Sequence, residues 1–431
     1  MISFLARLWK DRRGNALAIA CAAMPMVVGC AGLATDTIQW TLWRRQLQRA
    51  ADSAAIAGVY DRENASGATT NTSTAVCRDL ALNLHTWMAL QGTTPCTGTA
   101  GSYSTLSYPA DASYETNQVT VTLKIQQPLP FSSLFMATAP LITANATAAS
   151  IATGTPCALA LNSTGTAMNY NGNATVNAPT CILYSDSSAS NSASAGGSSA
   201  VTAKSIAAVG GIQQSNNWNV TQYIPYSPTL PDPLANVTPD PNAMHCTGAA
   251  LTDSTDFSSL GNTNCFSAIS LNPNRTINVP SSMSIIYVNG GNVDLKGTFN
   301  CTCTVVLTNQ SQSANAMIGT WSSNAQANNN ITAPQTGPYA NIAVYQDRRA
   351  IGNTDQINGG ASNQIQGAVY FPKDTLRING TGTAVSLCAM WIANNISFLG
   401  TSSIAISSPD DTVCSGKEPG GSPVKMVRLV A

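Results

Sequence analysis

NALAIACAAMPMVVGCAGLAT, residues 15–35, carries no charged side chain and is followed at once by Asp36. A helix needs about 20 predominantly apolar residues to cross the hydrocarbon core of a membrane, because each residue adds about 1.5 Å of rise. The stretch has this length, and the small-residue cleavage pattern of a secretory signal does not follow it. We therefore predict a retained single-pass membrane helix, with Pro25 tolerated inside the span. The alternative is the buried core helix of a soluble protein.

Charges and tryptophans on the two sides of this stretch indicate its orientation. Basic residues favour the cytoplasmic side of a membrane helix, and tryptophans favour the membrane–water interfaces. Trp9 precedes the stretch, and Trp40 and Trp43 follow it. The flanking basic residues are Arg7, Lys10, Arg12 and Arg13 before it, and Arg44, Arg45 and Arg49 well after it. We expect a cytoplasmic N-terminus, with the bulk of the chain on the other side of the membrane.

The chain contains 12 cysteines, of which Cys21 and Cys30 fall within the apolar stretch and are interpreted as small apolar residues. The other ten are an even set, which in an exported chain predicts disulfide bonds whose connectivity the sequence does not fix. Cys301 and Cys303 bond either to each other or elsewhere. A C-x-x-C motif is missing and there are two histidines, which argues against a zinc site. The expected pairs of near neighbours are Cys77–Cys96, Cys157–Cys181, Cys246–Cys265 and Cys388–Cys414.

The composition excludes several classes of protein. Charged residues make up 9% of the chain, where about a quarter is usual, and the formal net charge is zero, which argues against nucleic acid as a partner. The hydrophobic content of 44% is too high for a disordered chain. Polar sequence of this kind, rich in Thr and Asn and with many glycines, is typical of extended all-β proteins.

The first part of the chain predicts a small α+β unit on a long helix. The membrane helix should continue to about residue 60, and a second helical pattern covers 75–90. Residues 118–126 alternate apolar and polar side chains, which predicts a strand, and a second alternating run follows Pro140. We divide this part into an anchor with its continuing helix, residues 1–60, and a small α+β head, residues 61–153.

Residues 154–431 predict a β-rich domain that contains disulfides. Short alternating runs end in glycine and are followed by a new run, and Gly380 and Gly400 are twenty residues apart, about one coil of a solenoid. We favour a right-handed parallel β-helix, in which each coil buries its inward residues against the next. A β-sandwich made from the same short strands is the alternative. The proline cluster at 225–241 is interpreted as an extended connector or an insertion.

The sequence contains no Gly-x-Ser-x-Gly, P-loop or H-E-x-x-H motif, and we predict no catalytic residue and no cofactor. Neither His85, in a predicted helix, nor His245, in a loop, has a nucleophile in its sequence context, so both are interpreted as structural. β-Helix glycan lyases and hydrolases use clusters of Asp, Lys and Arg. The densest cluster here is interpreted instead as surface ion pairs, and it comprises Asp347, Arg348 and Arg349, with Lys373, Asp374 and Arg377 nearby.

One motif raises a metal site as a weaker alternative. Asp186, Ser188 and Ser190 match the D-x-S-x-S pattern of von Willebrand A domains, where a carboxylate and two hydroxyls would hold Mg²⁺. Such a site needs an amphipathic helix after the motif. The Ser-, Ala- and Gly-rich sequence that follows does not favour a helix.

The N-terminal segment resembles that of TadE/TadG-like Flp (tight adherence) pilus-assembly proteins. The resemblance covers about 45 residues: Arg12-Arg-Gly14-Asn15, the apolar span, Asp36, and Leu47-Gln-Arg-Ala-Ala-Asp52-Ser-Ala-Ala-Ile-Ala57. It implies a membrane-anchored envelope component rather than an enzyme. Related pseudopilins are cut after a glycine that has Glu five positions beyond it, whereas Gly14 is followed there by Ile19, so we expect an uncut anchor.

The resemblance also implies a location and partners. It places a single-pass protein in the bacterial inner membrane, with the bulk periplasmic or extracellular and residues 61–153 as a pilin-like head. The implied partners are pilus-assembly membrane proteins and pilins. The helix residues expected to meet partner helices are Leu47, Gln48, Ala51, Asp52 and Ala55.

Three functions follow from these observations. The first is a non-enzymatic component of a Tad/Flp pilus system, acting in assembly or as a minor pilin-like or adhesive subunit. The second is a surface carbohydrate-binding or carbohydrate-active β-helix on a Tad-type anchor, with a surface glycan or a host receptor as its partner. The third is a metal-dependent adhesin of the von Willebrand A kind.

Overall fold

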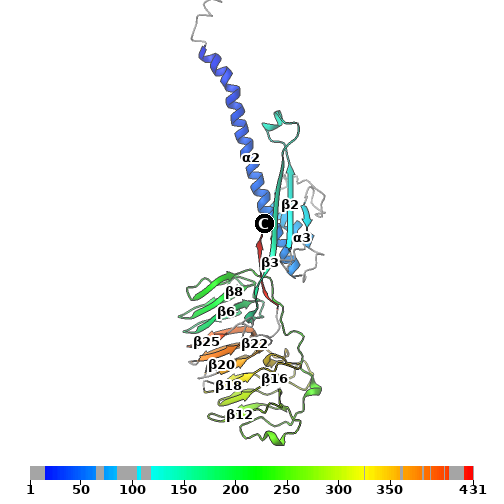
Figure 1. Ribbon diagram of the computed structural model, residues 1–431, viewed down its shortest axis with the longest axis vertical. Helices are drawn as coiled ribbons and strands as arrows, with labels where there is room; N and C mark the ends of the chain where they lie inside the picture. Colours follow the sequence, from blue (N-terminus) through cyan, green and yellow to red (C-terminus); the bar gives the residue numbers. More distant parts are fainter. Residues whose placement is uncertain are drawn as a thin grey trace, which may run out of the picture. The chain divides into compact units, whose positions relative to one another are not determined.

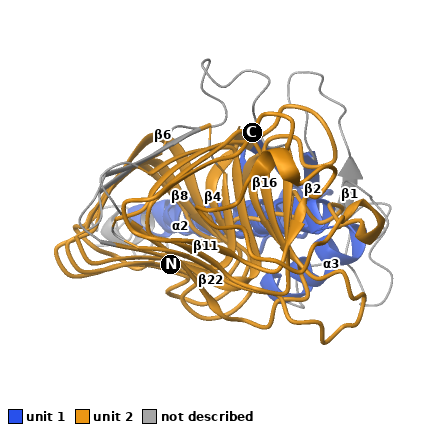
Figure 2. Ribbon diagram, turned by 90° about the horizontal axis from the view of Figure 1, so that it is seen from below, with its two compact units in different colours: residues 1–151, 427–431 blue, residues 152–426 orange. Residues whose placement is uncertain are grey.

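The computed structural model describes residues 15–64, 72–84, 104–107, 118–324, 326–359, 363–380, 383–388, 390–401, 403–406 and 422–430. The chain divides into two compact units, residues 1–151 with 427–431 (unit 1) and residues 152–426 (unit 2) (Figures 1 and 2). Each unit has its own apolar core. The predicted order, a long apolar helix followed by a mostly β domain with parallel strands, is confirmed.

Unit 1 is built on one long helix, which continues beyond the predicted end near residue 60. Its elements are α2 (Asn15–Asn64), α3 (Thr72–Asn83), β1 (Ser104–Ser107), β2 (Gln118–Gln126), the 3₁₀ turn η2 (Ser132–Leu134), and most of β3 (Leu141–Gly154) and the second half of β26 (Val424–Leu429). The strands form a sheet in the order β1-β2-β3-β26, and β2 and β3 pair as an antiparallel hairpin. The predicted second helix ends earlier than expected, and its positions 85–90, including His85, lie outside the described residues.

The core of unit 1 lies between α2 and the hairpin. The alternation expected for 118–126 places Val119, Val121, Leu123 and Ile125 on one face of β2, and all four are fully buried. They meet a row of small side chains on α2, which lets helix and sheet approach closely. A Cβ at Gly58 would lie 2.9 Å from the side chains of both Val119 and Val76, so the close approach depends on glycine there.

Unit 2 contains one sheet of 22 strands, and the pairings described within it are parallel. The strands are β4 (Pro156–Ala160), β5 (Met168–Tyr170), β6 (Thr175–Ser185), β7 (Ala193–Ala195), β8 (Ala200–Ala208), β9 (Trp218–Ile224), β10 (Cys265–Phe266), β11 (Ile269–Leu271), β12 (Thr276–Asn278), β13 (Ile285–Asn289), β14 (Val293–Leu295), β15 (Thr298–Cys301), β16 (Thr304–Thr308), β17 (Trp321–Ser323), β18 (Asn328–Thr332), β19 (Ile342–Gln346), β20 (Thr354–Gly359), β21 (Asn363–Gln366), β22 (Ala368–Gly380), β23 (Thr383–Leu387), β24 (Trp391–Leu399) and β25 (Ser403–Ile406). Two 3₁₀ turns, η3 (Pro241–Ala243) and η4 (Phe257–Ser259), lie between β9 and β10.

Strands pair at a regular interval along much of the chain. From β10 to β19 each strand pairs with the strand three places later, as in β10–β13, β13–β16 and β16–β19. One coil of chain therefore lies against the next. Figure 1 shows β12, β18, β20, β22, β25, β6 and β8 following one another along the stack, and Figure 2 views the coils superposed.

The coils are not stacked in the order of the sequence. β24 pairs with β4 and β25 pairs with β6, so the last coils of the chain lie against the first. The chain enters the stack in its middle, runs through β4, β6, β8 and β9 to one end, and resumes at the opposite end with residues 246–251, which bridge to β10 and β11. Residues 225–245, which we call the strap, connect the two ends.

The strap covers an outward apolar column of the sheet. Register places Tyr287, Val306, Tyr345, Tyr370, Ile392, Leu159 and Tyr184 beside one another on successive coils. Leu230, Leu234 and Met244 of the strap are buried in the same cluster. The Tyr345 hydroxyl donates to the Val237 carbonyl at 2.6 Å. The proline cluster, predicted as a connector or an insertion, is thus a connector that shields one face of the stack.

Disulfides link neighbouring segments of unit 2. Bonds join Cys157 to Cys181, Cys246 to Cys265, and Cys301 to Cys303. The first two match expected pairs, and the third is the local bridge. Cys77 and Cys388 are also disulfide-bonded, whereas their expected partners Cys96 and Cys414 lie outside the described residues. Cys21 and Cys30, in the apolar stretch, are free and exposed.

Candidate functional site

The first half of α2 exposes its apolar side chains. Within Ile19–Asn64, the most apolar window has a mean hydropathy of 1.5, and only 11% of that window is buried. The core helix of a soluble protein would bury most of such a window, so the exposure does not fit that alternative. The described residues contain one helix that is long and apolar enough to cross a membrane. Its large exposed side chains are Ile19, Met24, Met26, Val27, Val28, Leu33, Ile38 and Leu42.

Asp36 marks the end of the charge-free stretch and holds a second segment of unit 1. Its side chain is buried, with the residue 3% exposed. Its carboxylate accepts hydrogen bonds from the backbone N–H groups of Phe131 and Ser132 and from the Ser132 hydroxyl. One helical turn earlier, a Cβ at Gly32 would lie 2.2 Å from the Phe131 ring, so the ring packs where α2 has no side chain. The loop between β2 and β3 is thereby clamped to α2.

The second half of α2 packs against the sheet of its own unit. Leu47, Ala51 and Ala55 are fully buried there, and Gln48 donates to the Asn145 carbonyl at 2.7 Å and to Asp52 at 2.8 Å. These five positions were expected to face partner helices; in the structure Gln48 and Asp52 are partly exposed, whereas Leu47, Ala51 and Ala55 face the sheet of unit 1. The reason is that a row of small apolar residues suits a sheet at close range as well as it suits another helix.

A different face of α2 remains open. Leu42, Arg45 and Arg49 are exposed at helical spacing, and neither arginine forms an ion pair among the described residues. They line a cavity of about 620 Å³ together with Trp43, Gln46 and Asn83 among others. This face combines apolar and cationic groups and is available to a partner.

Residues 14–63 match a family model described as "Putative Flp pilus-assembly TadE/G-like". The predicted resemblance is therefore confirmed for this segment. No curated protein and no solved structure matches the chain. The TadE/G-like segment coincides with α2 almost end to end and includes Asp36 and the buried row of small residues. Together with the exposed apolar helix, it indicates a membrane-anchored protein of a Tad/Flp pilus system.

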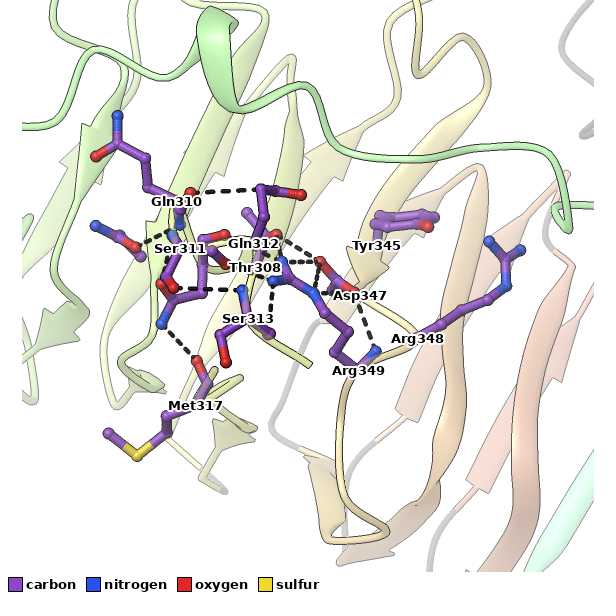
Figure 3. A network of polar contacts seen from close by, with 12 residues as sticks. Thr308, Gln310, Ser311, Gln312, Ser313, Met317, Tyr345, Asp347, Arg348 and Arg349 are labelled. Carbon is purple, nitrogen blue, oxygen red and sulfur yellow. Dashed lines mark hydrogen bonds and ion pairs between the residues drawn. The ribbon is translucent and has the colours of Figure 1, made fainter. Parts of the chain in front are cut away.

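Unit 2 lies outside the TadE/G-like segment, and its charged cluster holds a loop in place (Figure 3). Arg349 forms an ion pair with Asp347 at 2.7 Å and donates to the carbonyls of Asn309 and Ser313. The Thr308 hydroxyl donates to Asp347 at 2.7 Å. Burial raises the pKa of Asp347, but the hydrogen bonds from Arg349 and Thr308 outweigh it and leave the pKa below its usual range. These groups were expected as surface ion pairs, and instead they are largely buried around the loop at 309–317.

Arg348 points away from this pair and fastens the strap. It forms an ion pair with Asp232 at 3.3 Å, donates to the carbonyls of Leu234 and Val237, and lies 5.3 Å above the Tyr370 ring. The three adjacent charges lie just after the end of β19, and they serve two separate contacts: Asp347 pairs with Arg349, whereas Arg348 between them pairs with the strap. Lys373 and Arg377 are exposed, and Asp374 is buried inside the stack.

A buried pair of carboxyl groups, Asp355 and Asp374, was not expected from the sequence, which placed Asp374 among surface ion pairs. Asp355 and Asp374 are both fully buried, and the Gln346 amide donates to Asp374 at 2.7 Å and to Asp355 at 3.3 Å. Burial, with Asp374 nearby, raises the pKa of Asp355 to about 8. Each aspartate stands two positions before an inward apolar residue, Ile357 or Leu376, and that alternation was the available signal.

Asp186 and Ser188 of the D-x-S-x-S motif form hydrogen bonds to other segments of unit 2. The Asp186 carboxylate accepts from the Leu230 N–H of the strap at 2.9 Å, and burial raises its pKa to about 7. The Ser188 hydroxyl donates to the Ser163 carbonyl at 3.1 Å. β7 follows the motif, where a von Willebrand A site would have a helix, and Ser190 lies in the turn before it. Within the described residues, Asp, Glu, His and Cys side chains form no group of three that could hold a metal, and His245 is exposed.

Proposed function

We propose that this protein is a non-enzymatic, membrane-anchored subunit of a Tad/Flp pilus system, which acts in pilus assembly or as a minor pilin-like or adhesive subunit. The observation that carries the proposal is the TadE/G-like match at 14–63 on a helix whose first half exposes its apolar side chains. The charged groups of unit 2 support the non-enzymatic part, because Asp347, Arg348 and Arg349 are all engaged in holding the chain together.

The proposed protein lies in the bacterial inner membrane, with a cytoplasmic N-terminus and its bulk periplasmic or extracellular. The basic residues before the span support this orientation. The bonds Cys157–Cys181 and Cys246–Cys265 support it as well, because disulfides persist in oxidising compartments.

Residues 61–153 act, on this proposal, as a pilin-like head, and unit 2 is a right-handed parallel β-helix that serves as a rigid exported domain. The parallel pairing and the three-strand interval from β10 to β19 support the β-helix, since β-sandwiches are made of antiparallel sheets. Partner helices of the pilus system would meet the open face of α2, at Leu42, Arg45 and Arg49, rather than the buried face.

Gene deletion tests the proposal. We expect loss or alteration of pili, restored by the full-length chain and not by a variant that carries Arg45→Glu and Arg49→Glu. A matched control is Arg275→Glu with Lys296→Glu, which reverses two exposed charges of unit 2. Normal piliation and surface attachment in the deletion strain would rule the proposal out.

A further inference from the structure

We propose that the loop between β2 and β3, residues 127–140, is a second membrane-contacting element that places apolar side chains in the lipid interface beside α2. We call this loop the hairpin tip. The inference rests on the proposed membrane anchor and adds a lipid-binding surface outside the span.

The hairpin tip is apolar where an exposed loop is ordinarily polar. Leu134 is 73% exposed, Phe135 is 79% exposed and Met136 is 51% exposed. The sequence carries no charged residue between Lys124 and Asp186, so the hairpin tip itself brings no charge to the lipid, and the Asp36 carboxylate that it contacts is buried. Contiguous exposed apolar groups of this size mark contact sites for membranes or other proteins.

The clamp sets the position of the hairpin tip. At one end of the hairpin, Arg62 donates to the Gln118 carbonyl, and at the other, Phe131 and Ser132 bond to Asp36. β2 therefore runs antiparallel to α2, toward the N-terminal, apolar half of the helix (Figure 1). Gly32 and Asp36 stand at the end of the charge-free stretch, which is where a spanning helix leaves the hydrocarbon core.

The backbone of the hairpin tip is suited to a medium without water. The N–H groups of Ser133, Leu134, Phe135 and Met136 donate within the tip, to the carbonyls of Leu129, Phe131, Ser132 and Ser132 respectively. The Ser133 hydroxyl donates to the Pro130 carbonyl. Placing a backbone N–H group without a hydrogen-bond partner in hydrocarbon costs about several kcal/mol of free energy. This pairing is compatible with lipid contact at Ser133 to Met136, the apex of the hairpin tip.

Continuity with the membrane span favours lipid over a protein as the occupant. Exposed Leu33 lies three positions before Asp36, and therefore on the side of α2 that the tip meets, so the apolar surface of the tip continues that of the helix. Interfacial elements bury phenylalanine, leucine and similar side chains at the boundary between headgroups and acyl chains. The structure thus provides two apolar elements at one level, joined through a single buried carboxylate.

Photocrosslinking tests the inference in the full-length protein, reconstituted in phosphatidylethanolamine–phosphatidylglycerol vesicles. A benzophenone amino acid replaces Phe135, or Leu82 on α3 as a control of equal exposure, 79%, or Met26 in the span, which is 74% exposed. After irradiation, mass spectrometry measures the phospholipid adduct. We expect the Phe135 position to give phospholipid adduct in a yield similar to that at Met26, and the Leu82 position to give none.

Three results would overturn the inference. An adduct yield at Phe135 no greater than at Leu82, with Met26 labelled, would refute lipid contact by the hairpin tip and leave the anchor intact. A protein adduct at Phe135 in cell membranes, in place of the lipid adduct, would refute it in favour of a protein partner. Absence of adduct at Met26 would refute the membrane anchor together with the inference, whereas a failure of the pilus function would appear only in the deletion strain.

Discussion

A single methyl group at Gly172 tests whether the last coils of the chain lie against the first. Gly172 has φ +76°, and a Cβ there would lie 3.1 Å from both the N and the O of Gly400. A backbone hydrogen bond holds the two segments together, because the Asn173 N–H donates to the Gly400 carbonyl at 2.8 Å. Gly165 has φ +67° in the same part of the chain, but a Cβ there would meet nothing within 4 Å.

The two substitutions to alanine share one cost and differ in another. A left-handed conformation costs a residue with a Cβ about 1–2 kcal/mol, which applies at both positions. At Gly172 the backbone of Gly400 must also shift, and such overpacking typically costs about 1–3 kcal/mol more. We expect Gly165→Ala to destabilise by about 1–2 kcal/mol and Gly172→Ala by about 2–5 kcal/mol.

Urea unfolding of the full chain in detergent micelles measures the difference. The tryptophans Trp218, Trp321 and Trp391 are buried in unit 2 and report its unfolding by fluorescence. Equal destabilisation by the two variants would refute the coil order, because Gly172 would then have no backbone of a distant coil beside it.

Three further predictions concern buried charge and the clamp. The pKa of Asp355 is raised from 3.8 to about 8, so its contribution to stability is complete below pH 3.8 and is lost as the pH rises to about 8. The urea midpoint of the wild type should therefore fall over this range, and that of the Asp355→Asn variant should fall less. An equal fall in the two proteins would contradict the raised pKa of Asp355. Asp36→Ala should speed chymotrypsin cleavage in the hairpin tip, whereas Asp256→Ala, which removes the cap of η4, should leave that rate unchanged. Arg348→Met should destabilise unit 2 by about 1.5–3 kcal/mol, as expected for lost hydrogen bonds to a charged group, and expose the strap to proteases. The exposed Arg377→Met is its control, and equal urea midpoints for the two variants would refute the role of Arg348.

Local patterns predicted the features that depend on neighbours in sequence. The apolar stretch predicted the helix that forms the exposed half of α2, and the alternation at 118–126 predicted which side chains of β2 are buried. Near spacing gave the pairs Cys157–Cys181 and Cys246–Cys265, because one coil of chain brings such positions together. Asp355 and Asp374 share the inward alternation of Ile357 and Leu376, so their burial also follows from a local pattern.

Other features could not be read from local pattern. The small apolar row Leu47, Ala51 and Ala55 is equally suited to a partner helix and to the sheet that it actually meets. Asp347, Arg348 and Arg349 are consecutive, yet their partners lie in the loop at 309–317 and in the strap, far away in sequence. Burial and contact depend on which distant segment arrives, and no local property of these residues specifies that segment.

The sequence by itself determined a charge-free helix that can span a membrane, its TadE/G-like character, and a β-rich remainder. These follow from side-chain polarity and spacing along a continuous segment, which act before any distant contact forms. Only the tertiary structure decided that β24 and β25 close onto β4 and β6, that the strap covers a column of tyrosines, and that Asp36 clamps the hairpin tip. The strand edges of different parallel coils have nearly equivalent backbone hydrogen-bonding groups. Which coil pairs with which therefore depends on how the side chains of whole coils fit together, and on the glycines at their turns.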